Sequence, residues 1–343
     1  MNENPNRIPR REFLGEKLGL GGLAAWAGGR VAAAQGGGAS PRPGRVLGPE
    51  FQYNIGSASR TDPRQVIYEE TARHPAGLKE PRRIAVDGQD RLHVVGDRHW
   101  VVLDRGGREI SRHELADSPR CVAAAGDGTI GIGYRDRIEM LDGAGRSQSG
   151  WEGLGDRAVL TSIALTDEDV LAADAGNRLI WRFDRAGKLR GQIGKKDPAR
   201  GVPGFVIPSP YFDIAVTHDG IIWAANPGQH RVEAYTIEGG FELGWGEYSS
   251  GVEGFCGCCN PINFALLPDG SFVTCEKGLV RVKVYSARGK FQGVVAGPEA
   301  FPGYRDAAAN PVGLDVACDS GGRVLVVDPL AAEVRVFTRK SNG

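Results

Sequence analysis

The chain has 343 residues, 41% of them hydrophobic and 51 of them glycine, and its 42 basic side chains balance 42 acidic ones. This length and composition fit one large all-β domain. The balanced charge argues against a nucleic-acid partner, which would require a strongly basic face.

The N-terminal segment carries the three parts of an export signal in the usual order. Arg10 and Arg11 begin a twin-arginine pattern, a glycine-rich and weakly apolar run spans residues 18–27, and residues 32–34 offer an A-x-A cleavage site. The apolar run is too short and too rich in glycine to span a membrane. We therefore expect residues 1–34 to be a Tat signal peptide, and the mature protein to lie in the periplasm or outside the cell.

Two short segments follow the signal. Residues 35–48 are rich in Gly, Pro and Arg and are expected to be a disordered leader. Residues 49–80 are expected to hold a closing strand, FQYNI at 51–55, and a linker. Within the linker, residues 63–72 favour a short helix.

Residues 163–193 predict four short strands in succession. In the third, Leu179, Trp181 and Phe183 take alternate positions, the period expected when one face of a strand is buried. Asp, Asn and Gly at the breaks suit tight turns. A single sheet of this size cannot bury both of its faces, so copies must stack.

The same unit recurs six times, at spacings of about 40 to 50 residues. The innermost-strand positions are Ile84, Val122, Ile163, Ile214, Phe264 and Leu314. Four-stranded repeats at this spacing are typical of β-propellers. We therefore predict an all-β fold, a six-bladed β-propeller over residues 81–340.

Two runs resemble NHL repeats: AGNRLIWRFDRAG at 175–187 and PGQHRVEAY at 227–235. The resemblance extends over the predicted propeller and implies six blades of four strands. It says little about function, because propellers of this kind include binding modules, lyases and lactonases.

The sixth blade has three recognisable strands before the chain ends. Its fourth strand must come from elsewhere, because the ring otherwise keeps an open edge. The sequence predicts that residues 51–55 pair with residues 334–337 and close the ring.

One face of the propeller is expected to carry the functional loops. Loops between second and third strands lie there together with the long connections between blades, whereas the opposite face has short D-G turns. Binding residues favour loops on a rigid scaffold. The predicted ligand-binding residues are His99, Arg135, Asn177, His230, Asn260 and Lys277. Two of the long loops share the pattern G-V-x-G-F, and their Phe205 and Phe255 are expected to pack between blades.

The least ordinary stretch is FCGCCNP at residues 255–261, and three interpretations of its thiols stay open. Four cysteines are expected on one face: Cys256, Cys258, Cys259 and Cys275. An even cysteine count in an exported protein favours disulfides, with Cys275 bonded to one of the loop cysteines. The four thiolates could instead bind a metal ion with His99, His230 and Asp97, although C-x-C-C is not a standard zinc spacing. Cys258 and Cys259 could also form a strained, redox-active pair beside Lys277.

Catalytic propellers of this architecture suggest a second class of function. The amidating lyases hold zinc with several histidines, a pattern that His99 and His230 alone do not meet. The gluconolactonase-like propellers hold calcium at the axis. Five residues near the starts of inner strands offer comparable donors: Asp213, Asn260, Asn263, Asn310 and Asp315. Asn-Pro before a strand is also common turn chemistry, and we prefer that explanation.

The sequence therefore predicts an exported, monomeric propeller that binds a protein, a peptide or a small molecule through its loop-rich face. The alternative is a metal-dependent lyase or lactonase with its site at the same face. No catalytic residue is assigned, and a metal ion is the one cofactor considered.

Overall fold

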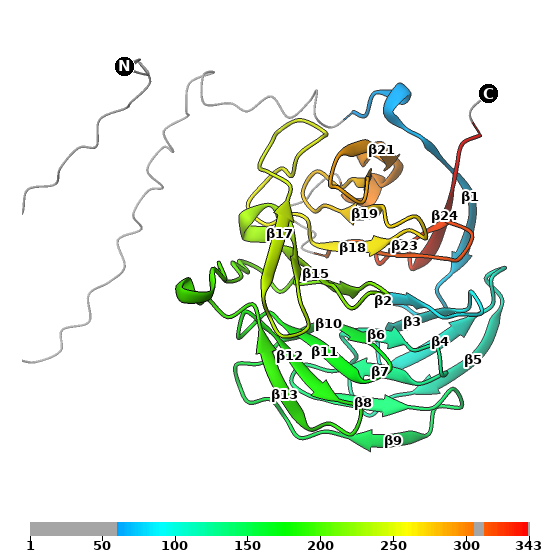
Figure 1. Cartoon of the computed structure of the whole chain (residues 1–343). Coiled ribbons are helices and arrows are strands. Elements are labelled where there is room, and N and C mark those ends of the chain that lie inside the picture. The colour runs from blue at the N-terminus through cyan, green and yellow to red at the C-terminus, as the bar shows by residue number, and fades with distance from the viewer. Residues whose placement is uncertain (1–59, 305–311, 342–343) are drawn as a thin grey trace, which may run out of the picture. The chain divides into compact units, whose positions relative to one another are not determined.

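The computed structural model describes residues 60–304 and 312–341 (Figure 1). The chain divides into two units, Met1–Gln52 and Tyr53–Gly343, and all described residues belong to the second. The predicted signal peptide, the leader, residues 51–55 and Asn310 lie outside the described residues. Across the described ranges, no helix is long and apolar enough to cross a membrane.

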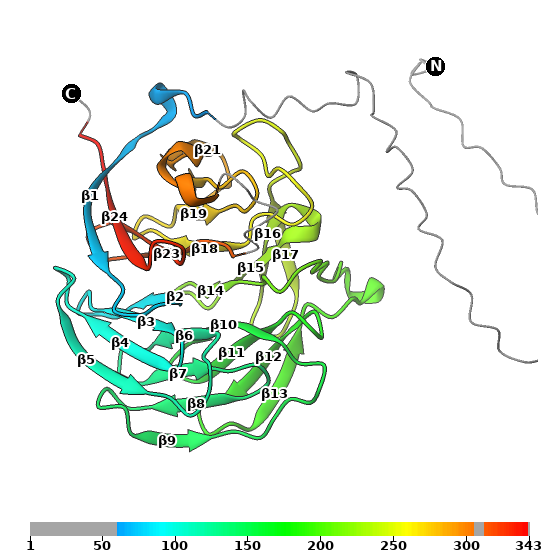
Figure 2. The same ribbon diagram turned by 180° about the vertical axis from the view of Figure 1, so that it is seen from behind.

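Six four-stranded antiparallel sheets form the six blades of a propeller, which confirms the predicted fold (Figures 1 and 2). Blade 1 consists of β2 (Pro81–Val86), β3 (Leu92–Gly96), β4 (His99–Leu103) and β5 (Glu109–Glu114). Blade 2 consists of β6 (Cys121–Ala124), β7 (Ile130–Gly133), β8 (Ile138–Leu141) and β9 (Ser147–Gly150). Blade 3 consists of β10 (Leu160–Leu165), β11 (Asp169–Asp174), β12 (Leu179–Asp184) and β13 (Leu189–Ile193). Blade 4 consists of β14 (Ile214–Val216), β15 (Ile222–Asn226), β16 (Arg231–Tyr235) and β17 (Phe241–Trp245). Blade 5 consists of β18 (Asn263–Leu266), β19 (Phe272–Cys275), β20 (Val282–Tyr285) and β21 (Phe291–Ala296). Blade 6 consists of β22 (Asp315–Cys318), β23 (Val324–Asp328), β24 (Glu333–Arg339) and β1 (Tyr68–Pro75).

Helical structure in the described residues is limited to five single-turn 3-10 segments. They are η2 (Pro63–Gln65), η3 (Pro198–Arg200), η4 (Pro227–Gln229), η5 (Pro298–Ala300) and η6 (Pro302–Tyr304). Each begins with proline, whose fixed φ and missing N–H suit the first position of a helical turn. They lie before the first strand and in the loops, so the sheets carry the fold.

Burial is greatest in the second strand of a blade and least at the rim, as blade 3 shows. Every residue of β11 is buried, because neighbouring blades cover both faces of this strand. The outer strand β13 exposes Leu189 and Arg190, because it forms the rim of the disc. The hydrophobic effect therefore acts mainly between blades, and the six apolar clusters each join neighbouring sheets.

The two G-V-x-G-F loops place their phenylalanines between blades, as predicted. Phe205 packs against Phe212 and Tyr235, with ring centroids 4.6 and 5.3 Å apart. Phe255 is fully buried, and its ring centroid lies 5.5 Å from that of Tyr285. Burying one such side chain stabilises the fold by about 1.5–3 kcal/mol.

Four turns on the opposite face repeat one hydrogen-bonding unit. In each, an Asp oxygen accepts backbone N–H groups two and four residues later, and its second oxygen accepts from the Arg four residues later. The pairs are Asp87 with Arg91, Asp104 with Arg108, Asp142 with Arg146, and Asp319 with Arg323. The four carboxylates thus hold their own turns together, as expected of plain turns.

A different segment from the predicted one closes the ring. β1 pairs antiparallel with β24 from Tyr68 opposite Arg339 to Pro75 opposite Glu333, and Figure 2 shows β1 (blue) beside β24 (red). The other edge of β24 pairs with β23, so no edge is left for residues 51–55. The predicted helix over 63–72 is also wrong beyond η2. Closure by an N-terminal strand within residues 49–80 is confirmed, but that strand is β1.

Candidate functional site

A ring of polar residues stands at the starts of the innermost strands. By register with the second strands, each blade contributes one residue to the ring. Its members are Arg83, Cys121, Ser162, Asp213, Asn263 and Asp315. Beyond the ring, the inner strands line an axial cavity of about 310 Å³. In blade 6, the residue that lines this cavity at the position of Ile163 is Val316. The sequence had predicted Leu314 for that position, but Leu314 is buried between blades 5 and 6.

Arg83 fills the centre of this ring. Its Nη1 lies 2.6 Å from Asp315 Oδ1 and 3.7 Å from Asp213 Oδ1, and its Nη2 donates to the Thr161 carbonyl at 2.7 Å. Burial opposes the charge, but the two carboxylates outweigh burial and raise the pKa of Arg83. Burial and the nearby Asp213 raise the pKa of Asp315 to about 6, against the lowering effect of Arg83.

The axial carboxylates do not fit the calcium site considered from the sequence. Asp213 and Asp315 do converge, but the Arg83 guanidinium lies between them. Their second oxygens accept backbone N–H groups, from Phe264 to Asp213 and from Ile84 to Asp315, both at 2.8 Å. Their oxygens are therefore already used, and the protein's own cation occupies the place of a metal ion.

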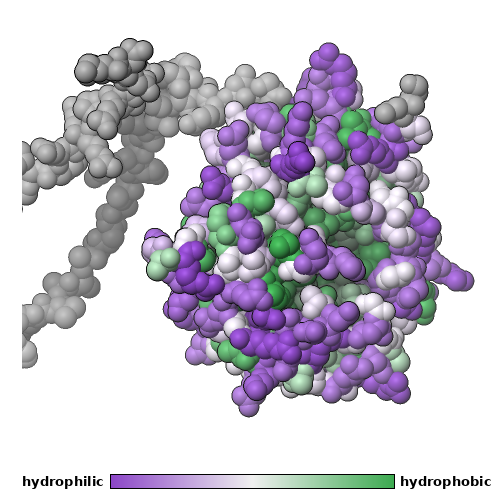
Figure 3. Space-filling view, viewed as in Figure 1, coloured by the Kyte–Doolittle hydropathy of each residue, from purple (hydrophilic) through white to green (hydrophobic). Residues whose placement is uncertain are grey.

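A pocket of about 450 Å³ lies at this end of the axis, on the face of the blade-connecting loops. Much of its wall is apolar, formed by Pro81, Leu160, Pro210, Tyr211, Val312, Pro329 and Leu330. The polar wall residues include Glu80, Arg82, Arg83, Arg120 and Asn263. In the orientation of Figure 1, the space-filling view shows mostly hydrophilic surface, with hydrophobic residues gathered in a hollowed area near the middle (Figure 3). Asn263 is buried, and its Oδ1 lacks a hydrogen-bond partner among the described residues.

Arg120 is the unusual member of this wall. It precedes β6, and its backbone N–H donates to the Gly133 carbonyl at 2.7 Å. Within residues 60–304 and 312–341, no carboxylate or hydrogen-bond acceptor contacts its guanidinium. Partial burial, with the positive charges of Arg82 and Arg135, lowers the pKa of Arg120. Among the described residues, the pocket thus contains a half-buried cation without a counterion.

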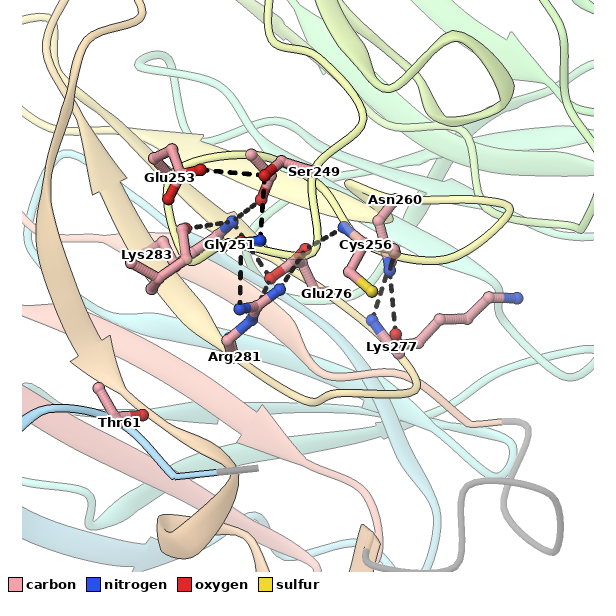
Figure 4. A network of polar contacts seen from close by, with 12 residues as sticks. Thr61, Ser249, Gly251, Glu253, Cys256, Asn260, Glu276, Lys277, Arg281 and Lys283 are labelled. Carbon is pink, nitrogen blue, oxygen red and sulfur yellow. Dashed lines mark hydrogen bonds and ion pairs between the residues drawn. The ribbon is translucent and has the colours of Figure 1, made fainter. Parts of the chain in front are cut away.

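The Cys-rich loop lies beside this pocket and is held by Asn260. The Asn260 side chain donates to the Cys256 and Lys277 carbonyls at 2.5 and 3.0 Å and accepts from the Lys277 N–H at 2.9 Å (Figure 4). The Lys277 ammonium in turn donates to Ser209 Oγ at 3.1 Å and lies 4.9 Å from the ring centre of Tyr211. Tyr211 connects this arrangement with the pocket wall.

A buried charge cluster anchors the same loop from below (Figure 4). Glu276 accepts from the Cys256 N–H at 3.1 Å and pairs with Arg281 at 2.7 Å and with Lys283 at 3.2 Å. Lys283 is fully buried and also donates to the Val252 and Gly254 carbonyls. Burial, only partly offset by Glu276, lowers the pKa of Lys283 to about 8.

All six cysteines are free thiols, so the predicted disulfide between Cys275 and the loop is wrong. Cys275 is buried in the apolar cluster that joins blades 5 and 6, whereas Glu276, the next residue, contacts the loop. Side chains alternate along a strand, so the two point to opposite faces. Burial raises the pKa of Cys275 well above its usual value. In the described part of the chain, no three His, Cys, Asp or Glu side chains gather as metal ligands, so the predicted cysteine metal set is not assembled.

The structure brings three of the six predicted ligand-binding residues together. His230 approaches the backbone of Asn260, which holds Lys277, and burial lowers the pKa of His230. The other three lie on separate loops of the same face. Arg135 donates to the Asp156 carbonyl, Asn177 donates to Asp174, and His99 begins β4. Asp97, the proposed acidic ligand, accepts the N–H groups of residues 79 and 80.

The sequence interpretation missed Arg83, Arg120 and Tyr211. Each precedes or begins an innermost strand, where the first residues face the axis. For the two arginines, a basic residue at that position was the available signal, since arginine near the axis of a propeller must be paired or face a ligand. Nothing comparable marked Tyr211.

No protein-family model and no curated protein matches the sequence. Solved structures match in fold. A streptogramin B lyase is 12% identical with a TM-score of 0.53, over 80% of this chain and 98% of that one. A catalytically inactive virginiamycin B lyase from Staphylococcus aureus, solved with quinupristin, is 11% identical with a TM-score of 0.52, over 76% of this chain and 80% of that one. A protein of unknown function from Bacteroides thetaiotaomicron is 12% identical with a TM-score of 0.55, over 80% of this chain and 76% of that one. Identities this low show a shared fold alone.

Proposed function

We propose that this protein is a binding propeller whose axial pocket takes a small organic anion with an apolar body. The observation that carries the proposal is the half-buried Arg120 guanidinium, which has no counterion in the described residues. A buried charge is costly unless it is paired. A carboxylate or phosphate of the ligand supplies that pair, and an arginine fork binds either group through two hydrogen bonds.

The rest of the pocket defines the remainder of the ligand. Its volume of about 450 Å³ lies within the range of small-molecule sites. Leu160, Val312 and Leu330 offer apolar contacts, and Tyr211 offers an aromatic face. Asn263 adds a polar residue to the wall. Together these walls favour an aryl or branched-alkyl acid over a sugar or a bare inorganic ion.

A thermal-shift screen of organic acids against the matching amides tests this function. We expect acids with an apolar body to raise the melting temperature and the neutral amides to leave it unchanged. Arg120→Gln should abolish the shift. The matched control is Arg108→Gln, which removes an exposed arginine that pairs with Asp104 away from the pocket. Equal shifts for acids and amides would reject an anion site.

We further propose that the propeller is of the NHL type, acts as a monomer, and is exported through the Tat pathway to the periplasm or the outside of the cell. The repeat-like runs and the Arg10-Arg11 signal pattern support this proposal. Replacing both arginines by lysine should retain the protein in the cytoplasm. Export of that variant at the wild-type level would contradict it.

The metal-dependent lyase or lactonase remains the second class considered, but no observation of the site favours it. The axial carboxylates are occupied by Arg83 and backbone N–H groups, and Cys275 lies on the other side of blade 5 from the loop thiols. Metal analysis of protein exported in its native host, after mild purification, distinguishes the classes, because a stoichiometric bound metal would support the enzyme.

A further inference from the structure

Two neighbouring thiols in the Cys-rich loop are in contact and differ in exposure. The Sγ atoms of Cys258 and Cys259 lie 3.3 Å apart. Cys258 is exposed, whereas only 4% of Cys259 is exposed. A reagent in solution therefore reaches Cys258 first, and Cys259 stands directly behind it.

The buried thiol has an environment that favours its anion. Burial raises the pKa of Cys259, but the neighbouring Cys258, Ser209 and Lys277 side chains outweigh burial and lower it. The contact with Cys259 raises the pKa of Cys258, so the proton is held on the exposed sulfur. The Lys277 ammonium adds a positive charge beside the sulfur. Thiolates, not thiols, attack disulfides, and a nearby cation is the usual means of stabilising them.

We propose that Cys258 and Cys259 form a reversible thiol–disulfide couple that exchanges with a small disulfide. The Cys258 thiolate attacks one sulfur of the disulfide RSSR, forms a mixed disulfide and releases RS⁻. The Cys259 thiolate then attacks Sγ of Cys258 and releases the second RS⁻. Two protons from the cysteines balance the two thiolates released, so the pair loses two electrons and RSSR becomes two RSH.

Covalent geometry makes the oxidised form easy to reduce again. Adjacent Cα atoms are about 3.8 Å apart across a trans peptide, and a little closer across a cis one, whereas relaxed disulfides join Cα atoms about 4.4–6.8 Å apart. A bond between adjacent cysteines is therefore strained, and strained, exposed disulfides are the labile ones. The couple is thus suited to cycling rather than to holding the loop, which Asn260 and Glu276 already anchor. The inference does not depend on what the axial pocket binds.

Reaction of the full-length protein with glutathione disulfide tests the couple. After alkylation of the remaining thiols, peptide mass spectrometry should find a disulfide between Cys258 and Cys259, and Cys256 alkylated. In Cys259→Ser the reaction should stop at a glutathione adduct on Cys258. In Cys258→Ser little adduct should form, because Cys259 is buried. Cys256→Ser is the matched control from the same loop and should react like the wild type.

A second measurement separates the role of Lys277 from a structural one. The rate at which Cys259 displaces glutathione from Cys258 should fall at neutral pH in Lys277→Met and recover at higher pH, because its thiolate forms less readily. Lys277→Arg should keep the wild-type pH profile. The proposal is overturned if the wild type forms no Cys258–Cys259 disulfide, or if Cys259→Ser accumulates no more mixed disulfide than the wild type.

Discussion

Arg83 and Arg120 both lie near the starts of inner strands, in blades 1 and 2, but differ in their partners. Arg83 contacts Asp213, Asp315 and the Thr161 carbonyl, so its charge is balanced inside the protein. Arg120 contacts none of these groups and faces the pocket. The difference teaches that a buried cation with its own counterion belongs to the scaffold, whereas one without a counterion is available to a ligand.

The largest loss of stability is expected from Arg83→Met. This change leaves two buried carboxylates, Asp213 and Asp315, without their cation. Breaking a buried ion pair in this way costs about 3–5 kcal/mol. Urea unfolding should show that loss, and adding Asp315→Asn to Arg83→Met should recover part of it. A loss below about 1 kcal/mol would mean that the pair behaves like a surface one.

Arg335→Met should have the next largest effect. Arg335 of β24 lies 2.7 Å from Glu70 of β1 and donates to the Ala300 carbonyl at 2.7 Å, so it ties the closing strand to its neighbour. Glu70 keeps contact with Arg73 and is partly exposed, so we expect a loss of about 2–3 kcal/mol. Faster hydrogen exchange confined to β1 and β24 would identify the cause, whereas uniform exchange across all blades would contradict it.

The pH dependence of the free energy of unfolding should reveal the contribution of the Asp315 carboxyl group. Because the folded pKa of Asp315 is raised to about 6, the folded state binds more protons than the unfolded state between about pH 4 and 6. This contribution to stability is present below pH 4 and is lost as the pH rises through 6, by roughly 2–3 kcal/mol. Other carboxylates give the opposite slope, so the comparison is between wild type and Asp315→Asn. Parallel curves for the two proteins would refute the shift.

Lys283→Met should cost about 1–2 kcal/mol, because Glu276 keeps Arg281 while two loop carbonyls lose their donor. The pKa of Lys283 is lowered to about 8, so its charged form is disfavoured in the folded protein. Wild-type stability should therefore gain a contribution as the pH rises from 8 towards 10.5, and this gain should be missing in the variant. Limited proteolysis should cut the loop at 246–261 faster in Lys283→Met, and an unchanged cleavage rate would show that the cluster does not anchor it.

The blades were predictable from the sequence, but the closing strand was not. Leu179, Trp181 and Phe183 show the period of a strand, and D-G turns mark where strands end. In β1 the register shifts between Glu70 and Ala72, so the alternation breaks in the middle of the strand. A bulge of this kind hides a strand, and the sequence E-E-T-A then resembles a helix.

The candidate site was predictable in position only. Sequence reasoning placed the Cys-rich loop, Lys277 and Asn260 correctly on one face, because strand order fixes the face of each loop. It joined Cys275 to that loop wrongly, because strand alternation, not strand position, decides which neighbour a side chain contacts. The unpaired state of Arg120 depends on which carboxylates lie near it in space, and the sequence does not contain that information locally.

Arg120→Gln should have the smallest effect: the variant should be as stable as the wild type or slightly more stable. The change removes a half-buried cation that has no partner among the described residues. Urea unfolding checks this expectation. A clear destabilisation would reveal a structural role for Arg120 and would remove the distinction from Arg83.

Calorimetric titration of one aryl carboxylate into the wild type and into Arg120→Gln measures the part of Arg120 in anion binding. We expect binding to the wild type at one site and at least tenfold weaker binding to the variant, a difference of about 1.4 kcal/mol or more. Equal affinity for both proteins would contradict it, because the anion would then bind without the guanidinium that lacks a counterion.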